Sequence, residues 1–375
     1  MIRNAKRIAA VGAVLTLGFA SAAQASIGSG GGSGATTSNT LVSVSVSPIA
    51  SVQTTSILAG NITGSLGGGF GGGGFGGGAG PISAAPGPQT SLIDNVQSTG
   101  IAGGQSVLFD LRALKQQQGG SAGSKPMNMN AWLRGAYTSI TNTDRGGEFE
   151  GGATNVVGGV DYLFQNTKIP VLVGLSGGYE NTDIDTTFNT GTFEGNGFTL
   201  APYIGLRLLP NLLIDMNVGM SWIDYDVSRT VGGSKRTGSF DATRLFYGAN
   251  ATYNHFANNW RLSPTVGIIH MREEQDGYTE NNGTAVLGSA IDLTRAKAGV
   301  EVGYNLGGVN KTLTGIEPFV KMIGEYDIES EDGVDLGNGV TSSDEKYGAV
   351  AGGGVNLKLG EMVSGTLDGS YNSIG

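Results

Sequence analysis

The chain has 375 residues, a formal net charge of −9, 67 glycines and no cysteine, and 14% of its residues are charged. This length allows one large domain and a smaller appendage. The acidic balance argues against a nucleic-acid partner. The absence of cysteine suits an oxidising compartment, where stray thiols are a liability.

A secretory signal peptide opens the chain. Arg3, Lys6 and Arg7 form its positive region, residues 8–20 its apolar region, and an Ala-Gln-Ala cleavage site ends at Ala25. We therefore expect residues 1–25 to be removed. No later segment is long and apolar enough for a membrane-spanning helix.

Residues 26–105 form a Gly/Ser-rich arm of low complexity. Its glycine runs cannot bury enough surface to offset the loss of chain entropy, so we expect a flexible spacer. The other interpretation is a short passenger that is exposed and contacts another surface. Within the arm, Leu41–Ser47 alternates Val with Ser, which predicts a short strand.

The stretch SVLFDLRALKQQQ at residues 106–118 predicts the one helix of the mature chain. Val107, Leu108, Leu111 and Leu114 share a helical face, and two glycines follow the stretch. Such a helix can lie in one of two places relative to a barrel. It packs on the outside at the periplasmic rim, or it lies in the lumen as a plug.

From Met129 onward the chain alternates with period two. In LLIDMNVGMSW at residues 212–222, Leu, Ile, Met, Val, Met and Trp alternate with mostly polar or small residues. The same pattern predicts eleven strands, at residues 129–140, 153–164, 171–180, 198–208, 212–222, 243–256, 261–271, 293–306, 316–326, 347–359 and 362–371.

The charged side chains within these strands must be in contact with water. A soluble sandwich would place the polar faces outside and cover the apolar faces with a second sheet. A transmembrane barrel places lipid against the apolar face and a wet lumen against the polar one. The lumen would then hold charges of both signs: Arg134, Arg207, Lys297, Glu301, Glu317, Lys321 and Glu325.

The connections between the strands alternate between short turns and long polar loops, which is typical of outer-membrane barrels with the long loops outward. Aromatic residues such as Trp222 and Trp260 stand near strand ends, as interfacial girdles require. The predicted fold is therefore an all-β, antiparallel, up-and-down transmembrane barrel. Its expected location is the outer membrane of a Gram-negative bacterium, with arm and long loops exposed.

The signal peptide, the Gly-rich arm and the segments SVLFDLRALKQQQ, NAWLRGAY, VGLSGGYE and VSGTLDGSYNSIG resemble the C-terminal β-domain of autotransporters, the type V secretion proteins. The likeness covers residues 106–375. It implies a twelve-stranded barrel, a lumen helix at residues 107–117 and a link at residues 119–128. It also implies a passenger that reaches the cell surface through the barrel, and help from the barrel-assembly machinery.

Two features depart from that family. The passenger is very short, and the eleven strands leave the count odd, with two open edges. Each bare backbone group in lipid costs several kcal/mol. We expect that a closing strand is missing after Gly375, and we keep insertion of Leu41–Ser47 as the alternative closure.

The sequence contains no pattern that points to catalysis. Ser176 fits G-x-S-x-G but lies inside a predicted strand, whereas a nucleophile elbow opens a helix. His255 and His270 fall at opposite barrel ends. The acidic residues 325–335 lack EF-hand spacing and are interpreted as a solvated loop. We expect no catalytic, cofactor-binding or metal-binding residues, and no enzyme.

The predicted function is an outer-membrane translocator and anchor that displays or exports its own short N-terminal segment. The alternative is a structural or adhesive surface protein that acts through its long loops. A barrel protease or lipase is the weakest hypothesis. The expected partners are outer-membrane lipid, the barrel-assembly machinery and a surface or host ligand at the loops. The expected assembly is a monomer.

Overall fold

The computed structural model describes residues 103–114, 129–142, 148–164, 167–330, 346–359 and 363–374, together with scattered positions between 42 and 66. All of them belong to the unit that spans residues 32–375. The predicted signal peptide and most of the predicted arm lie outside the described residues.

Strands make up almost all of the described chain. They are β1 (Gly103–Leu114), β2 (Met129–Asn142), β3 (Phe149–Phe164), β4 (Val171–Thr186), β5 (Gly191–Leu209), β6 (Leu212–Val231), β7 (Ser234–Tyr253), β8 (His255–Ala257), β9 (Trp260–Gln275), β10 (Tyr278–Thr279), β11 (Ala285–Val286), β12 (Ser289–Tyr304), β13 (Leu313–Ser330), β14 (Tyr347–Leu359) and β15 (Val363–Ile374).

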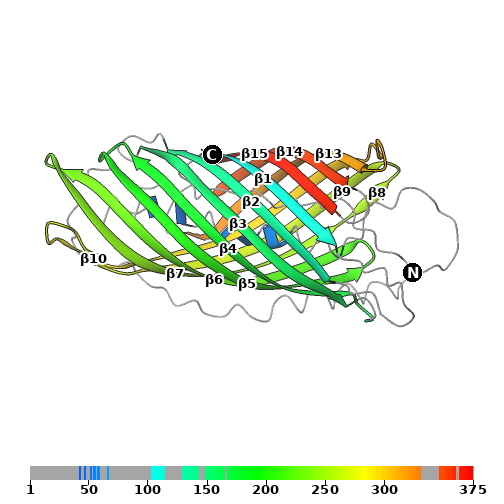
Figure 1. Ribbon diagram of the computed structural model, residues 1–375, viewed down its shortest axis with the longest axis horizontal. Coiled ribbons are helices and arrows are strands. Elements are labelled where there is room, and N and C mark those ends of the chain that lie inside the picture. Colours follow the sequence, from blue (N-terminus) through cyan, green and yellow to red (C-terminus); the bar gives the residue numbers. More distant parts are fainter. Residues whose placement is uncertain are drawn as a thin grey trace. The chain divides into compact units, whose positions relative to one another are not determined.

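Twelve of these strands close into an antiparallel ring (Figure 1). The order runs β12, β13, β14, β15, β1, β2, β3, β4, β5, β6, β7 and β9, and β9 pairs back onto β12. The short β8 also pairs with β9, and β10 pairs only with β11. Each ring strand thus has a hydrogen-bonding partner on both sides, which is the condition for a sheet in lipid.

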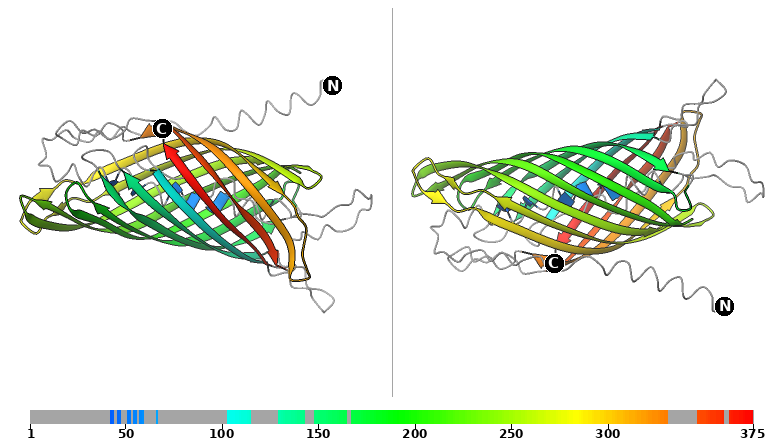
Figure 2. Two further views of the ribbon diagram at one scale, coloured as in Figure 1. Left: turned by 90° about the horizontal axis from the view of Figure 1, so that it is seen from above. Right: turned by 90° about the horizontal axis from the view of Figure 1, so that it is seen from below.

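All eleven predicted strands are present, and several are longer than predicted. β6 and β7 have 20 residues each. They continue through most of the predicted 223–242 loop to a two-residue turn. Gly232 and Gly233 in that turn have φ of +57° and +79°, which only glycine adopts readily in a tight hairpin. Figure 2 shows these hairpins reaching beyond the rest of one barrel end.

The alternation of exposure confirms the predicted register. Val218 and Val300 face outward and are 44% and 36% exposed, while their neighbours Asn217 and Glu301 are 6% and 0% exposed. The apolar residues thus cover the outside of the ring and the polar ones line the lumen. Of the predicted lumen charges, all are buried except Arg207, which is half-buried.

The helix predicted at residues 106–118 is wrong, because β1 occupies most of that stretch. β1 pairs with β15 from Gly104↔Asn372 to Ala113↔Val363 and with β2 on its other side. The sequence alternates Phe109 and Leu111 with Asp110 and Arg112, so it fits a strand as well as a helix. Two strand edges that would otherwise be bare in lipid favour the strand.

The closure of the ring by β1 also corrects both predicted closures. No strand after Gly375 is needed to close it, and Leu41–Ser47 does not supply one. Val42, Ser43, Val46 and Ser47 are helical instead of extended.

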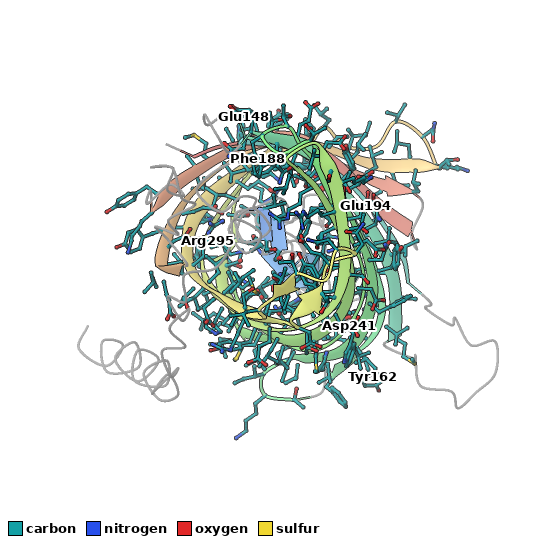
Figure 3. All side chains as sticks on the ribbon, turned by 90° about the vertical axis from the view of Figure 1, so that its left-hand side faces the viewer. Glu148, Tyr162, Phe188, Glu194, Asp241 and Arg295 are labelled. Atoms are coloured by element: carbon teal, nitrogen blue, oxygen red, sulfur yellow. The ribbon has the colours of Figure 1, made fainter. Side chains whose placement is uncertain are left out.

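The helical residues of the described chain lie at positions between 42 and 66, well before the predicted helix. They include Val52, Thr55, Ile57 and Leu58, all nearly fully buried. Figure 3, seen from the end where the long hairpins project, shows their blue ribbon inside the ring of strands. None of the described residues forms a helix that is both long and apolar enough to cross a membrane.

Candidate functional site: the occupied lumen

Four hydrogen bonds tie the helical residues to one wall of the lumen, made of β2, β3 and β6. The Ser47 hydroxyl lies 3.3 Å from the Tyr225 hydroxyl of β6. Further along the same strand, Thr55 Oγ1 donates to Asn217 Oδ1 at 3.4 Å. Tyr225 is nearer the long-hairpin end than Asn217, so the helical segment enters the lumen at that end.

The adjacent strands β2 and β3 contribute the other two bonds. Asn155 of β3 donates from Nδ2 to Thr54 Oγ1 at 3.0 Å. Arg134 of β2 donates from Nη1 to the carbonyl oxygen of Ile57 at 3.1 Å. The second bond is made to the backbone of the segment, so it holds the segment whatever side chain stands at position 57.

A glycine of β7 completes this wall by making room for a threonine. A Cβ atom on Gly248 would lie 2.4 Å from Thr55 Cγ2, well inside van der Waals contact. Gly248 is buried and faces the lumen. The wall and the segment therefore fit each other at Gly248 and Thr55, where the missing side chain leaves space for the methyl group.

Apolar side chains of the barrel surround the segment in two clusters. Val42 and Val46 belong to a cluster with Phe149, Phe193 and Tyr225 near the long-hairpin end. Val52, Ile57, Leu58 and Leu66 belong to a second cluster that includes Trp132, Leu172 and Tyr203. The lumen is thus packed like a protein core where it meets the segment, although the polar faces of the strands predicted a wet lumen.

Arg244 of β7 links this wall to a buried ion network. Its guanidinium lies 2.8 Å from Glu180 Oε1 and 2.7 Å from Glu273 Oε2. Arg244 Nη2 also donates to the Tyr225 hydroxyl at 3.3 Å. Tyr225 thereby joins the charges of the barrel to Ser47 of the lumen segment.

The opposite wall, made of β9, β12, β13, β14 and β15, carries ion pairs that join its own strands. Arg261 contacts Glu301 and lies 2.8 Å from Glu317 Oε1. Asn356 Nδ2 donates to the same Glu317 oxygen at 3.0 Å. Lys321 pairs with Asp368 across β13 and β15.

Arg295 of β12 makes a further buried cluster on this wall. It lies 3.0 Å from Glu325 and also pairs with Asp327, both of β13. Glu325 and Asp327 belong to the acidic stretch that was interpreted as a solvated loop. That interpretation is wrong for these two residues, because both are buried in a strand. Residues 331–335 lie outside the described residues.

The motifs weighed for catalysis have structural roles where the structure describes them. Ser176 lies inside β4, and its hydroxyl donates to the carbonyl oxygen of Ala201 at 2.9 Å. His270 Nδ1 lies 2.8 Å from Thr294 Oγ1, while His255 stands in β8 at the other end of the ring. Among the described residues, no group of three or more potential ligands could hold a metal ion.

A closed antiparallel ring with an apolar outer face and a charged lumen defines the transmembrane β-barrels of outer membranes. Within that class, the family model described as the autotransporter beta-domain matches residues 131–370. The chain belongs to this family, and it is an outer-membrane barrel of the Gram-negative type.

Three solved structures are similar to this chain. The translocator domain of the autotransporter NalP from Neisseria meningitidis is 13% identical, with a TM-score of 0.45 over 75% of this chain and 90% of that one. The beta domain of the Bordetella autotransporter BrkA is 11% identical, with a TM-score of 0.48 over 74% and 100%. The transport unit of AIDA-I from Escherichia coli is 13% identical, with a TM-score of 0.41 over 73% and 90%.

Proposed function

We propose that this outer-membrane translocator barrel anchors its own N-terminal segment. In this proposal the lumen holds the described helical residues between positions 42 and 66, and the residues before them are displayed at the cell surface. The observation that supports this most directly is the set of hydrogen bonds from β2, β3 and β6 to Ser47, Thr54, Thr55 and Ile57. Through these bonds the wall binds the segment as a protein binds a ligand.

The direction of the segment supports display at the outer side. Outer-membrane barrels carry short turns on the periplasmic side and longer connections outside. β5, β6 and β7 are the longest strands, with 19 or 20 residues, and their hairpins project at one end. Ser47 is bound at the level of Tyr225, toward that end. The chain before Val42 then leaves the lumen on the outer side.

An epitope tag tests this proposal directly. A tag inserted between Ser33 and Gly34 should bind antibody on intact cells, because the proposal places that residue pair outside. A matched tag after Lys168, in the turn between β3 and β4 at the other end of the ring, should bind antibody only after the outer membrane is permeabilised. Both variants should keep heat-modifiable gel migration, which shows that the barrel has assembled.

The reverse labelling pattern would contradict the proposal. If the first tag stays hidden in intact cells and surface protease cuts only the projecting connections, the adhesive alternative gains support. In that case the lumen segment would be a structural plug that displays nothing.

A further inference from the structure

The connection between β9 and β12 folds back onto the lumen face of the projecting β6–β7 hairpin. Arg229 of β6 holds it through two charge-assisted hydrogen bonds, from Nε to Glu280 Oε1 at 2.7 Å and from Nη2 to Glu280 Oε2 at 3.0 Å. Both residues are at most 8% exposed. A bidentate pair of this kind fixes orientation as well as distance.

Backbone and ring contacts hold the same connection at further points. The Asn281 amide donates to the Thr237 carbonyl oxygen of β7 at 2.9 Å. The Tyr278 ring stacks on Phe240, with centroids 5.3 Å apart and an interplanar angle of 17°. A Cβ on Gly238 would lie 2.3 Å from Tyr278 Cε2, so this glycine makes room for the ring.

Tyr278 is the last member of an aromatic row along the lumen side. Phe193 of β5 and Tyr225 of β6 have centroids 4.9 Å apart, and Tyr225 and Phe240 of β7 have centroids 5.1 Å apart. The four rings therefore cross β5, β6, β7 and the β10–β11 connection in sequence. We call them the aromatic row: Phe193, Tyr225, Phe240 and Tyr278.

The aromatic row meets the entering end of the lumen segment. Val42 and Val46 belong to the same buried cluster as three of its rings, and Tyr278 packs against that cluster. Ser47 reaches the Tyr225 hydroxyl. Val42, Ser43, Val46 and Ser47 are at most 3% exposed, although they stand at the entrance of the lumen. Tyr278 therefore packs against the same cluster that buries this end of the segment.

We propose that the β10–β11 connection is a latch that closes the aromatic row over residues 42–47 of this chain's own N-terminal segment. The latch deepens the proposed function and rests on it, because it fixes the point at which the displayed chain leaves the lumen. Its occupant is a helical turn of small β-branched and hydroxyl residues. In Figure 3 the yellow β10–β11 ribbon lies within the outline of the strands at this end.

A cysteine probe in the cysteine-free chain tests the latch. Ser47→Cys is labelled on intact cells with a membrane-impermeant maleimide, first in the otherwise unchanged barrel. Two separate variants then open the latch. Arg229→Gln with Glu280→Gln removes the bidentate pair together with the 3.9 Å contact between Glu280 and Arg236, and Gly238→Ala displaces the Tyr278 ring. Each should raise the labelling rate roughly tenfold, the first by loss of a charge-assisted contact and the second by overpacking against the Tyr278 ring.

Matched controls distinguish opening of the latch from a general loss of barrel stability. Gly177→Ala, whose added Cβ would meet nothing nearer than 3.8 Å, should leave the rate unchanged. A probe at Thr55→Cys, deeper in the lumen, should keep its slow rate in both latch variants. Unchanged labelling at position 47, or equal acceleration at positions 47 and 55, would overturn the latch. A tag at Ser33 that stays hidden in every variant would instead overturn the display function.

Discussion

The two walls of the lumen differ in what their polar groups bind. On the wall of β2, β3 and β6, hydrogen bonds with the lumen segment are formed by Arg134, Asn155, Asn217 and Tyr225. On the wall of β9 and β12–β15, polar groups such as those around Arg261 bind one another across neighbouring strands. The described hydrogen bonds to the lumen segment thus come from the first wall, whereas the described ion pairs of the second wall join its own strands.

The largest expected effect comes from removing a buried cation from the second wall. Arg261→Met leaves the buried carboxylates of Glu301 and Glu317 without their cation, which should cost about 3–5 kcal/mol of barrel stability. The temperature at which the folded gel band disappears should fall accordingly. Arg272→Met, at a pair whose arginine side chain is 30% exposed, is the control and should cost about 0–1 kcal/mol.

This variant also tests whether the walls are independent. The described hydrogen bonds to the lumen segment come from the first wall, so labelling of a cysteine at position 47 should not change in Arg261→Met. If that variant releases the segment, recognition is shared by both walls and the comparison fails.

An intermediate effect is expected from Gly248→Ala on the first wall. The new Cβ would lie 2.4 Å from Thr55 Cγ2, and overpacking of this kind costs about 1–3 kcal/mol. The segment should be displaced while the ring stays closed, so single-channel conductance in planar bilayers should rise.

Thr55→Ala supplies the matched rescue for this prediction. It removes the methyl group that the new Cβ would meet, so the double variant should return to the conductance of Thr55→Ala alone. A conductance that stays high in the double variant would show that Gly248 acts on the barrel and not on the segment.

The smallest effect should come from Asn155→Ala. It removes the hydrogen bond to Thr54 Oγ1 and should weaken docking of the segment by about 1 kcal/mol. Hydrogen exchange of the lumen segment is the suitable measurement, because it resolves small changes in local opening. Thr252→Ala is the control, since its hydroxyl bonds only to Thr265 among the described side chains. No change with Asn155→Ala would assign docking to the apolar contacts alone.

The sequence predicted the strands of the ring but not the helical residues inside it. Alternation along residues 212–222 identifies a strand because lipid and lumen impose opposite demands on neighbouring positions. The outer extensions were missed because residues such as Asp183 and Glu194, which face outward there, are polar and resemble loop residues. A strand that continues beyond the lipid keeps its backbone hydrogen bonds. Its outward side chains no longer need to be apolar there, so the alternation that identifies a strand is lost.

The helical segment was missed for a related reason. Val42, Val46, Thr54 and Thr55 are β-branched and favour strands on their own. Their helical conformation depends on packing against the lumen wall, because the intrinsic strand propensity is too weak to oppose that packing. Residues 106–118 show the opposite error, because a short apolar run fits either period and only the open edges of the sheet decide between them.

The pairing of β1 with β15 has a consequence for the order of folding. The two strands that form this seam come from opposite ends of the described ring, so their contacts have the longest sequence separation in the sheet. Closing so long a loop carries a large entropic cost and makes the step slow. The seam should therefore be the last part of the ring to form. Until then the lumen is open along its length, and the helical residues between positions 42 and 66 can enter sideways instead of being threaded.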